Sequence, residues 1–146
     1  MTTQALHPAT HEPAAWPLGR AALVAALGSA IANAALFEVA AARGVFPPGP
    51  LFPTGPGQAM TLGPVVLVSV VAALAGAGVF ALLRSRTPRP MRTFTIAAAV
   101  VTVLSFAAPL AMPDWTGAQA TALDLMHVVA AGIVVWAMSR TEPRRG

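Results

Sequence analysis

The stretch LGPVVLVSVVAALAGAGVFALL, residues 62–83, decides the fold that this chain can adopt. It holds no charged side chain, and at about 1.5 Å of rise per residue a helix of this length crosses a hydrocarbon core of about 30 Å. A helix is the expected form because backbone amides cannot be left unpaired in lipid. The stretch therefore predicts a transmembrane helix.

Three more apolar stretches, residues 21–42, 93–110 and 118–138, have the same character, although the stretch at 93–110 is only just long enough. The chain is 56% hydrophobic and 10% charged, whereas a soluble domain carries about 25% charged residues. The sequence therefore predicts an all-α integral membrane four-helix bundle in up-down-up-down order. Its parts are a transmembrane domain at 20–140, a flexible cytoplasmic tail at 1–19 and a second tail at 141–146.

All nine basic residues are arginines, and all but Arg43 fall at one end of the predicted bundle. The positive-inside rule places that end, and therefore both termini, in the cytoplasm. Arginines at the ends of apolar runs attract anionic lipid headgroups, which are the expected partners, so the net charge of +4 does not indicate a nucleic-acid partner. The arginines at this end are Arg20, Arg84, Arg86, Arg89, Arg92, Arg140, Arg144 and Arg145.

The abundance of Ala, Gly, Pro and Arg without any lysine suggests a GC-rich bacterial genome, and hence a multi-pass protein of the bacterial cytoplasmic (inner) membrane. The absence of cysteine excludes disulfides and thiolate metal sites within the chain. The outer loop at residues 44–60 is rich in proline and glycine and cannot be helical. It is expected to be a rigid connector that either lies on the outer membrane surface or caps the bundle, with a functional lid as the alternative.

Small residues spaced four apart allow helices to approach closely in lipid. Gly28 and Ala32 form such a pair in the first span, and Ala72 and Gly76 form one in the second. These pairs favour a compact bundle, and they do not distinguish contacts within the chain from contacts in a homo-oligomer.

Ionisable residues fall inside the predicted spans, where each costs at least about 2.5 kcal/mol at the bilayer centre and therefore needs a partner or a task. Asp124 and His127, three residues apart, share a helix face and are expected to pair if that face points inward. Counted from the arginine end, polar residues of all four spans lie at a similar height in the outer half of the bilayer. The predicted polar layer comprises Glu38, Asn33, Ser69, Ser105, Asp124 and His127.

The polar layer has three interpretations, which stay open at this point. It is a hydrogen-bonded plug that fixes the register of the helices, with Glu38 reaching the outer interface; or it lines a water-accessible pocket for a cation, a proton or a small substrate. The third is a metal site made of one histidine and two carboxylates, for which no ligand-spacing motif exists. No catalytic residue, metal ligand or cofactor is assigned from the sequence.

The run ALDLMHVVAA, residues 122–131, follows a predicted third helix that contains Ser105 and ends in Pro109. In this it resembles an uncharacterised bacterial family of small four-helix membrane proteins, in which a Leu-Met-His motif opens the last helix. The resemblance implies the four-helix fold and the importance of His127, and it implies no activity.

Glu38 and Val39 in the first span are similar to the embedded glutamate motif of the small multidrug transporters, which are also four-helix chains. Here the glutamate lies near the outer end of its helix, and the arginines are strongly biased to one side. Both features differ from that family, so the sequence is interpreted first as a non-enzymatic structural, accessory or regulatory bundle. The alternatives are a small transporter or ligand-binding protein and, further off, a membrane enzyme; a homo-oligomer or a membrane partner protein is expected.

Overall fold

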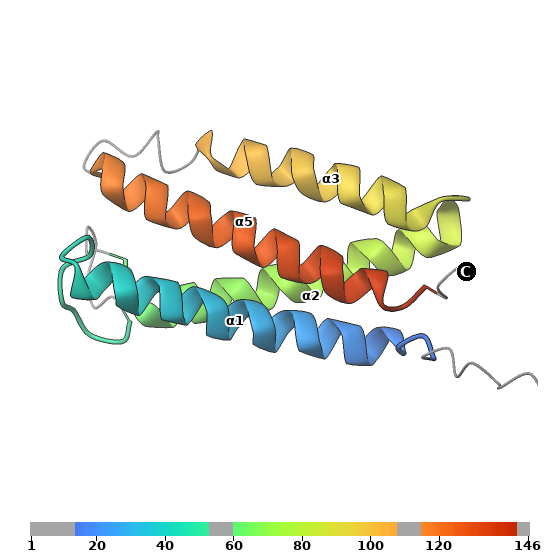
Figure 1. Cartoon of the computed structure of the whole chain (residues 1–146), viewed down its shortest axis with the longest axis horizontal. Helices are drawn as coiled ribbons and strands as arrows, with labels where there is room; N and C mark the ends of the chain where they lie inside the picture. The colour runs from blue at the N-terminus through green and yellow to red at the C-terminus, as the bar shows by residue number, and fades with distance from the viewer. Residues whose placement is uncertain (1–13, 53–59, 108–114, 143–146) are drawn as a thin grey trace, which may run out of the picture.

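The computed structural model of this protein describes residues 14–52, 60–107 and 115–142, which form α-helices and no strand (Figure 1). The prediction of an all-α protein is therefore confirmed for these residues. The helices, labelled as in Figure 1, are α1 (Leu18–Ala42), α2 (Leu62–Arg86), α3 (Pro90–Ser105) and α5 (Gly117–Ser139).

Three of these helices, α1, α2 and α5, are long and apolar enough to cross a membrane. The span predicted at 93–110 corresponds to α3, which has 16 residues. Helix α3 begins at Pro90, and proline suits this first position because the backbone N–H that it lacks would have no partner within the helix. A helix of that length rises only about 24 Å, which is less than a hydrocarbon core of about 30 Å. The last part of the predicted span, residues 108–110, lies outside the described residues.

The end of α1 is set by Gly44, whose φ of 76° is available to glycine at little cost. The backbone N–H of Gly44 donates to the carbonyl of Ala41, and that of Val45 donates to the carbonyl of Ala40, both at 2.9 Å. These bonds satisfy carbonyls that the end of the helix leaves without partners. At the other end of the chain, α5 begins with a capping box between Thr116 and Gln119.

After Gly44 the chain folds back over the end of the bundle. Phe46 is only 2% exposed, and its ring stacks on that of Phe37 with the centroids 5.0 Å apart. The backbone N–H of Gly63 and the hydroxyl of Thr61 both donate to the carbonyl of Leu51, at 2.8 and 3.0 Å. The described part of the loop at 44–60 therefore caps the bundle, which is one of the two placements expected, and residues 53–59 lie outside the described residues.

Helix α1 packs along both α2 and α5, whereas α3 packs on α2 and α5 from the far side (Figure 1). The backbone N–H of Trp16 donates to the carbonyl of Arg140 at 2.8 Å, so the start of α1 lies beside the end of α5. We call this the arginine end of the bundle: it comprises the start of α1, the end of α2, the start of α3 and the end of α5. Arg43 lies at the opposite end, at the end of α1.

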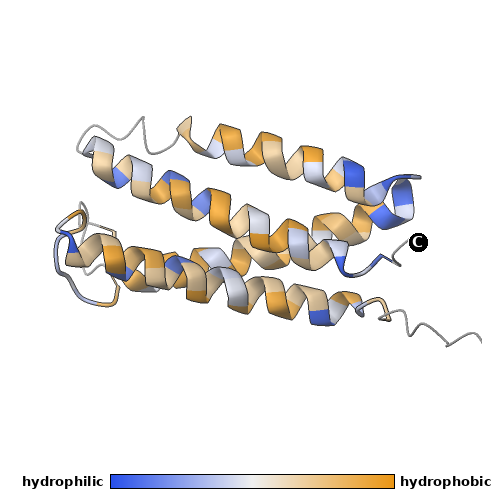
Figure 2. Cartoon of the chain, in the orientation of Figure 1, coloured by the Kyte–Doolittle hydropathy of each residue, from blue (hydrophilic) through white to orange (hydrophobic). Residues whose placement is uncertain are grey.

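The apolar core is divided into two clusters along the length of the bundle. The Phe80 cluster fills the half nearer the arginine end, where Phe80 packs edge-on against Phe94, the one buried residue of α3. The Phe37 cluster fills the other half and consists of Phe37, Phe46, Val65 and Met126. Large apolar side chains also cover the outward faces of the helices, and hydrophilic residues gather toward the ends (Figure 2). This distribution is that of a bundle surrounded by lipid.

Two glycines allow α5 to approach its neighbours closely. A Cβ atom on Gly28 of α1 would lie 3.2 Å from Cγ2 of Ile133, and one on Gly76 of α2 would lie 3.2 Å from Cγ1 of Val134. Both distances are shorter than ordinary van der Waals contact. Gly28 and Gly76, which the spacing of small residues singled out, thus contact the same segment of α5 within one chain.

We predict that Gly76→Leu lowers the free energy of unfolding by about 1–3 kcal/mol, because the added side chain must push α5 away from α2. The measurement is the thermal or denaturant unfolding of the purified chain in a mild detergent. Gly78→Leu is the matched control, since a Cβ at Gly78 meets nothing within 4 Å. Equal destabilisation by the two substitutions would show that the close approach at Gly76 does not matter.

Candidate functional site

Polar side chains occupy the gap between the two apolar clusters. On α1 the Phe80 cluster extends to Ala26 and the Phe37 cluster begins at Leu36, and Ser29 and Asn33 lie between them. On α2 the corresponding residue is Ser69. We call Ser29, Asn33 and Ser69 the buried polar layer; they are 0%, 5% and 5% exposed.

A hydrogen bond in this layer joins two helices. The side-chain amide of Asn33 donates to the hydroxyl oxygen of Ser69 at 2.9 Å, and the hydroxyl of Ser69 donates to the carbonyl of Val65 at 2.7 Å. Both residues are buried, so water does not compete for the donor or the acceptor. The bond therefore fixes the height of α1 relative to α2.

Ser29 differs from the other hydroxyl-bearing residues of the described helices. Those hydroxyls donate to a backbone carbonyl three or four residues earlier, as Ser69 does to Val65 and Thr102 does to Ala98. The hydroxyl of Ser29 has no hydrogen-bond partner in the described structure, and neither has Oδ1 of Asn33. Ser29 and Asn33 are four residues apart on one helix face, so two buried polar atoms with unused capacity lie near each other.

Helix α5 contributes Asp124 and His127, which are both half-buried. The prediction that they pair is wrong for this structure, because Nδ1 of His127 lies 2.8 Å from the carbonyl oxygen of Leu123 instead. That contact fits a donating Nδ1–H and follows from helix geometry, which places a carbonyl four residues earlier beneath the ring. Oδ1 of Asp124 is buried and has no hydrogen-bond partner among the described residues.

The packing places His127 at about the level of the buried polar layer. Gly28 of α1 faces Ile133, and Phe37 of α1 shares its cluster with Met126, so Asn33 lies beside the α5 segment between these two residues. His127 is in that segment. Within the Leu-Met-His motif, Met126 is the residue that enters the core, at 2% exposed.

The remaining residues of the predicted layer lie elsewhere. Glu38 is exposed on the side of α1 away from the core, and Ser105 of α3 donates to the carbonyl of Thr102. Among the described residues, no three His, Cys, Asp or Glu side chains come close enough to hold a metal ion, so Glu38, Asp124 and His127 do not form the metal site considered from the sequence. Of the six residues predicted to form the layer, Asn33 and Ser69 are the pair that a hydrogen bond joins.

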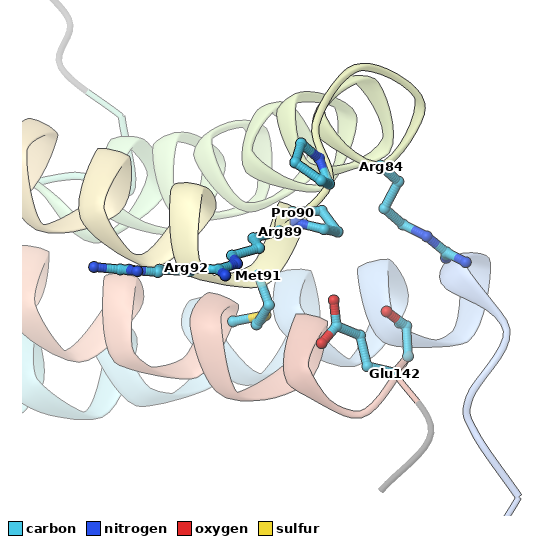
Figure 3. Close-up of a pocket in the computed structure, with 8 residues that line it drawn as sticks. Arg84, Arg89, Pro90, Met91, Arg92 and Glu142 are labelled. Carbon is cyan, nitrogen blue, oxygen red and sulfur yellow. The ribbon is translucent and has the colours of Figure 1, made fainter. Parts of the chain in front are cut away.

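The arginine end carries a second set of polar groups. Two of its arginines lie over tryptophan rings. The guanidinium carbon of Arg20 lies 4.6 Å from the centre of the Trp16 ring, and that of Arg140 lies 5.0 Å from the centre of the Trp136 ring. The two tryptophan rings pack edge to face, 5.8 Å apart. Arg84, Arg89 and Arg92 line a cleft (Figure 3). This cleft lies between the α2–α3 joint, residues 84–92, and the residues that follow α5. Arg86 is exposed outside the cleft, and Arg144 and Arg145 lie outside the described residues.

The described residues form an all-α bundle in which three helices are long and apolar enough to span a membrane, which suggests a membrane protein. The chain belongs to a family of unknown function, DUF6069, whose model matches residues 13–144. The resemblance to an uncharacterised family is thereby confirmed, whereas its Leu-Met-His motif and bacterial origin stay predictions. Neither a search of curated proteins nor a search of solved structures found a match to the chain.

The sequence did not single out Ser29 or the tryptophan pair. A serine in an alanine-rich helix is a weak signal, because its hydroxyl is usually satisfied by its own helix. Trp16 and its partner Trp136 are 120 residues apart in sequence, and nothing local indicates their contact. Both features depend on how the helices are rotated against each other.

We predict that Asn33→Ala and Ser69→Ala are energetically coupled, since each removes one side of the same interhelical bond. A double-mutant cycle on the unfolding of the chain in detergent should give a coupling of about 0.6–1.7 kcal/mol, the range found for such bonds in membrane proteins. The matched control is the cycle that combines Asn33→Ala with Ser139→Ala, because the Ser139 hydroxyl is exposed and donates only to the carbonyl of Trp136. A coupling indistinguishable from zero would mean that the bond does not hold α1 and α2 together.

Proposed function

We propose that the chain is a non-enzymatic multi-pass protein of the bacterial cytoplasmic (inner) membrane that serves as a structural, accessory or regulatory bundle. The observation that supports this proposal is the buried Asn33–Ser69 hydrogen bond, which lies between two apolar clusters. A polar contact in that position specifies helix register at little cost, as expected of a bundle whose task is to hold a defined surface in the membrane.

The proposed orientation places both termini in the cytoplasm. The described arginines support it, because all of them except Arg43 lie at the arginine end, where the positive-inside rule expects them. The exposed apolar faces of α2 and α3 are then available to lipid, to a second copy of the chain or to a membrane partner.

We predict that a reporter active only in the cytoplasm is active when fused after Gly146 or inserted at Thr87, and inactive when inserted at Pro48. The physical reason is the cost of moving the arginine-rich joint across the membrane. The matched control is the chain in which Arg84, Arg86, Arg89 and Arg92 are all changed to Gln, which should give mixed orientation. An inactive reporter at Thr87 in the unaltered chain would contradict the proposed orientation.

A second candidate function is the binding of a small cation or polar ligand within the membrane. It is favoured by polar atoms that have no hydrogen-bond partner in the described structure although they are buried: the hydroxyl of Ser29, Oδ1 of Asn33 and Oδ1 of Asp124. Oxygen atoms of this kind are ligands that hard cations prefer. The structural interpretation leaves these atoms without a task, whereas the binding interpretation uses them.

The two candidate functions predict different outcomes for the chain in which Asp124→Asn and His127→Gln are combined. For a structural bundle, this variant should assemble and unfold like the unaltered chain, because neither side chain bonds to another helix. For a binding protein, Na⁺ or K⁺ should raise the unfolding temperature of the unaltered chain in liposomes and should not affect the variant. If neither cation changes the unfolding temperature of the unaltered chain, cation binding by these groups is excluded.

A further inference from the structure

The cleft at the arginine end has the size and the lining of a ligand site (Figure 3). Its volume is about 670 Å³, within the range of about 300–1,000 Å³ found for small-molecule pockets. The α2–α3 joint supplies Arg84, Arg89 and Arg92, and the end of α5 supplies Glu142 from the opposite wall. Segments that are far apart in the sequence thus form one concave, basic surface.

The charge at this end is strongly unbalanced. Among the described residues the arginine end has one carboxylate, that of Glu142, against the guanidinium groups of Arg20, Arg84, Arg86, Arg89, Arg92 and Arg140. Glu142 can balance one of these six charges, and the other five have no second carboxylate at this end among the described residues. Arg20 and Arg140 lie over tryptophan rings, so the excess is concentrated at the cleft and at the neighbouring Arg86.

The arginines of the cleft can adapt to a ligand. Arg84, Arg89 and Arg92 are all exposed, and Figure 3 shows the side chains of Arg84 and Arg92 extending in opposite directions. An exposed arginine can turn toward an anion at the cost of side-chain entropy alone. Its planar, forked guanidinium matches the oxygen atoms of a phosphate in a bidentate arrangement.

The cleft also has an apolar component. Met91 is half-buried, and Figure 3 shows its side chain pointing from α3 toward α5. In a chain that spans a membrane, the start of α3 lies where lipid headgroups meet the hydrocarbon core. A basic cleft with an apolar floor at that depth suits a phosphate group attached to a glycerol backbone.

We propose that this cleft binds a phosphate group, carried either by the headgroup of an anionic phospholipid or by a small soluble phosphate. This site is separate from the buried polar layer, and it goes beyond the attraction of arginines to a charged surface because it assigns binding to Arg84, Arg89 and Arg92 and not to Arg86. Glu142, which lines the same cleft, opposes the anion and moderates its affinity.

The test is a titration of the full-length chain in a neutral detergent by isothermal calorimetry. The probes are dihexanoyl phosphatidic acid, glycerol 3-phosphate and inorganic phosphate, with dihexanoyl phosphatidylcholine as the zwitterionic control. Arg89→Gln and Arg92→Gln should each raise the Kd for the best probe about fivefold, the effect of one arginine near a membrane surface. Glu142→Gln should lower that Kd, because it removes the carboxylate that faces the anion.

Arg86→Gln is the matched control, since it removes one charge from the same end of the bundle but does not line the cleft. Its Kd should stay within about twofold of the unaltered value, as for a charge screened by solvent and salt. Equal effects of Arg86→Gln and Arg89→Gln would overturn the proposal, and so would the absence of binding by every phosphate probe. Unchanged helix content and elution volume establish that each variant is folded.

The choice of probe identifies the source of the phosphate. Binding of dihexanoyl phosphatidic acid alone, with the arginine dependence described, supports the cleft as a site for a lipid headgroup. Comparable binding of glycerol 3-phosphate or inorganic phosphate, with the same dependence, supports it as a site for a soluble phosphate. Binding of phosphatidylcholine as tight as that of phosphatidic acid would contradict recognition of anionic phosphate.

Discussion

The hydrogen bond between Asn33 and Ser69 is the constraint on which the alignment of α1 and α2 depends most, because the core above and below it is apolar. The Asn33–Ser69 bond lies where the Phe80 cluster ends and the Phe37 cluster begins. Burial of apolar surface alone gives little preference for one alignment of two helices over another, since lipid tails are as apolar as the side chains. The Asn33–Ser69 hydrogen bond, in contrast, is lost when α1 slides along α2, so the alignment of both clusters depends on it.

The position of each helix along the chain could be predicted from the sequence, but its rotation could not. The length of apolar runs sets the boundaries, and counting residues from the arginines placed Asn33 and Ser69 at the same height. Glu38 shows the limit of that method: it is one residue from the buried Phe37, and a rotation of about 100° per residue turns it away from the core. A helix in lipid is apolar on all sides, so hydrophobic periodicity does not reveal which face is buried.

The contacts of α5 show the same division between what is local and what is not. The capping box at Thr116 and Gln119 is encoded within four residues and could be read from the sequence. Ile133 and Val134 of α5 pack against Gly28 of α1 and Gly76 of α2. Only the folded arrangement distinguishes these two glycines from Gly78 and Gly132, where an added Cβ atom would meet nothing within 4 Å. Spacing alone predicted that Asp124 pairs with His127. Nδ1 of His127 instead contacts the carbonyl oxygen of Leu123, which lies one turn earlier on the same helix.

The bond from the backbone of Trp16 to the carbonyl of Arg140 has a consequence for how the protein is made. Helix α1 has its main partners in α2 and α5, and the backbone just before α1 bonds to the residue that follows α5. Until α5 has been inserted, α1 packs only on α2, which also contacts α3, and the surfaces at Gly28 and Gly76 lack the α5 side chains that cover them. Closure of the bundle therefore waits for α5, and a chain truncated before α5 keeps α1, α2 and α3 but lacks the helix that contacts all three.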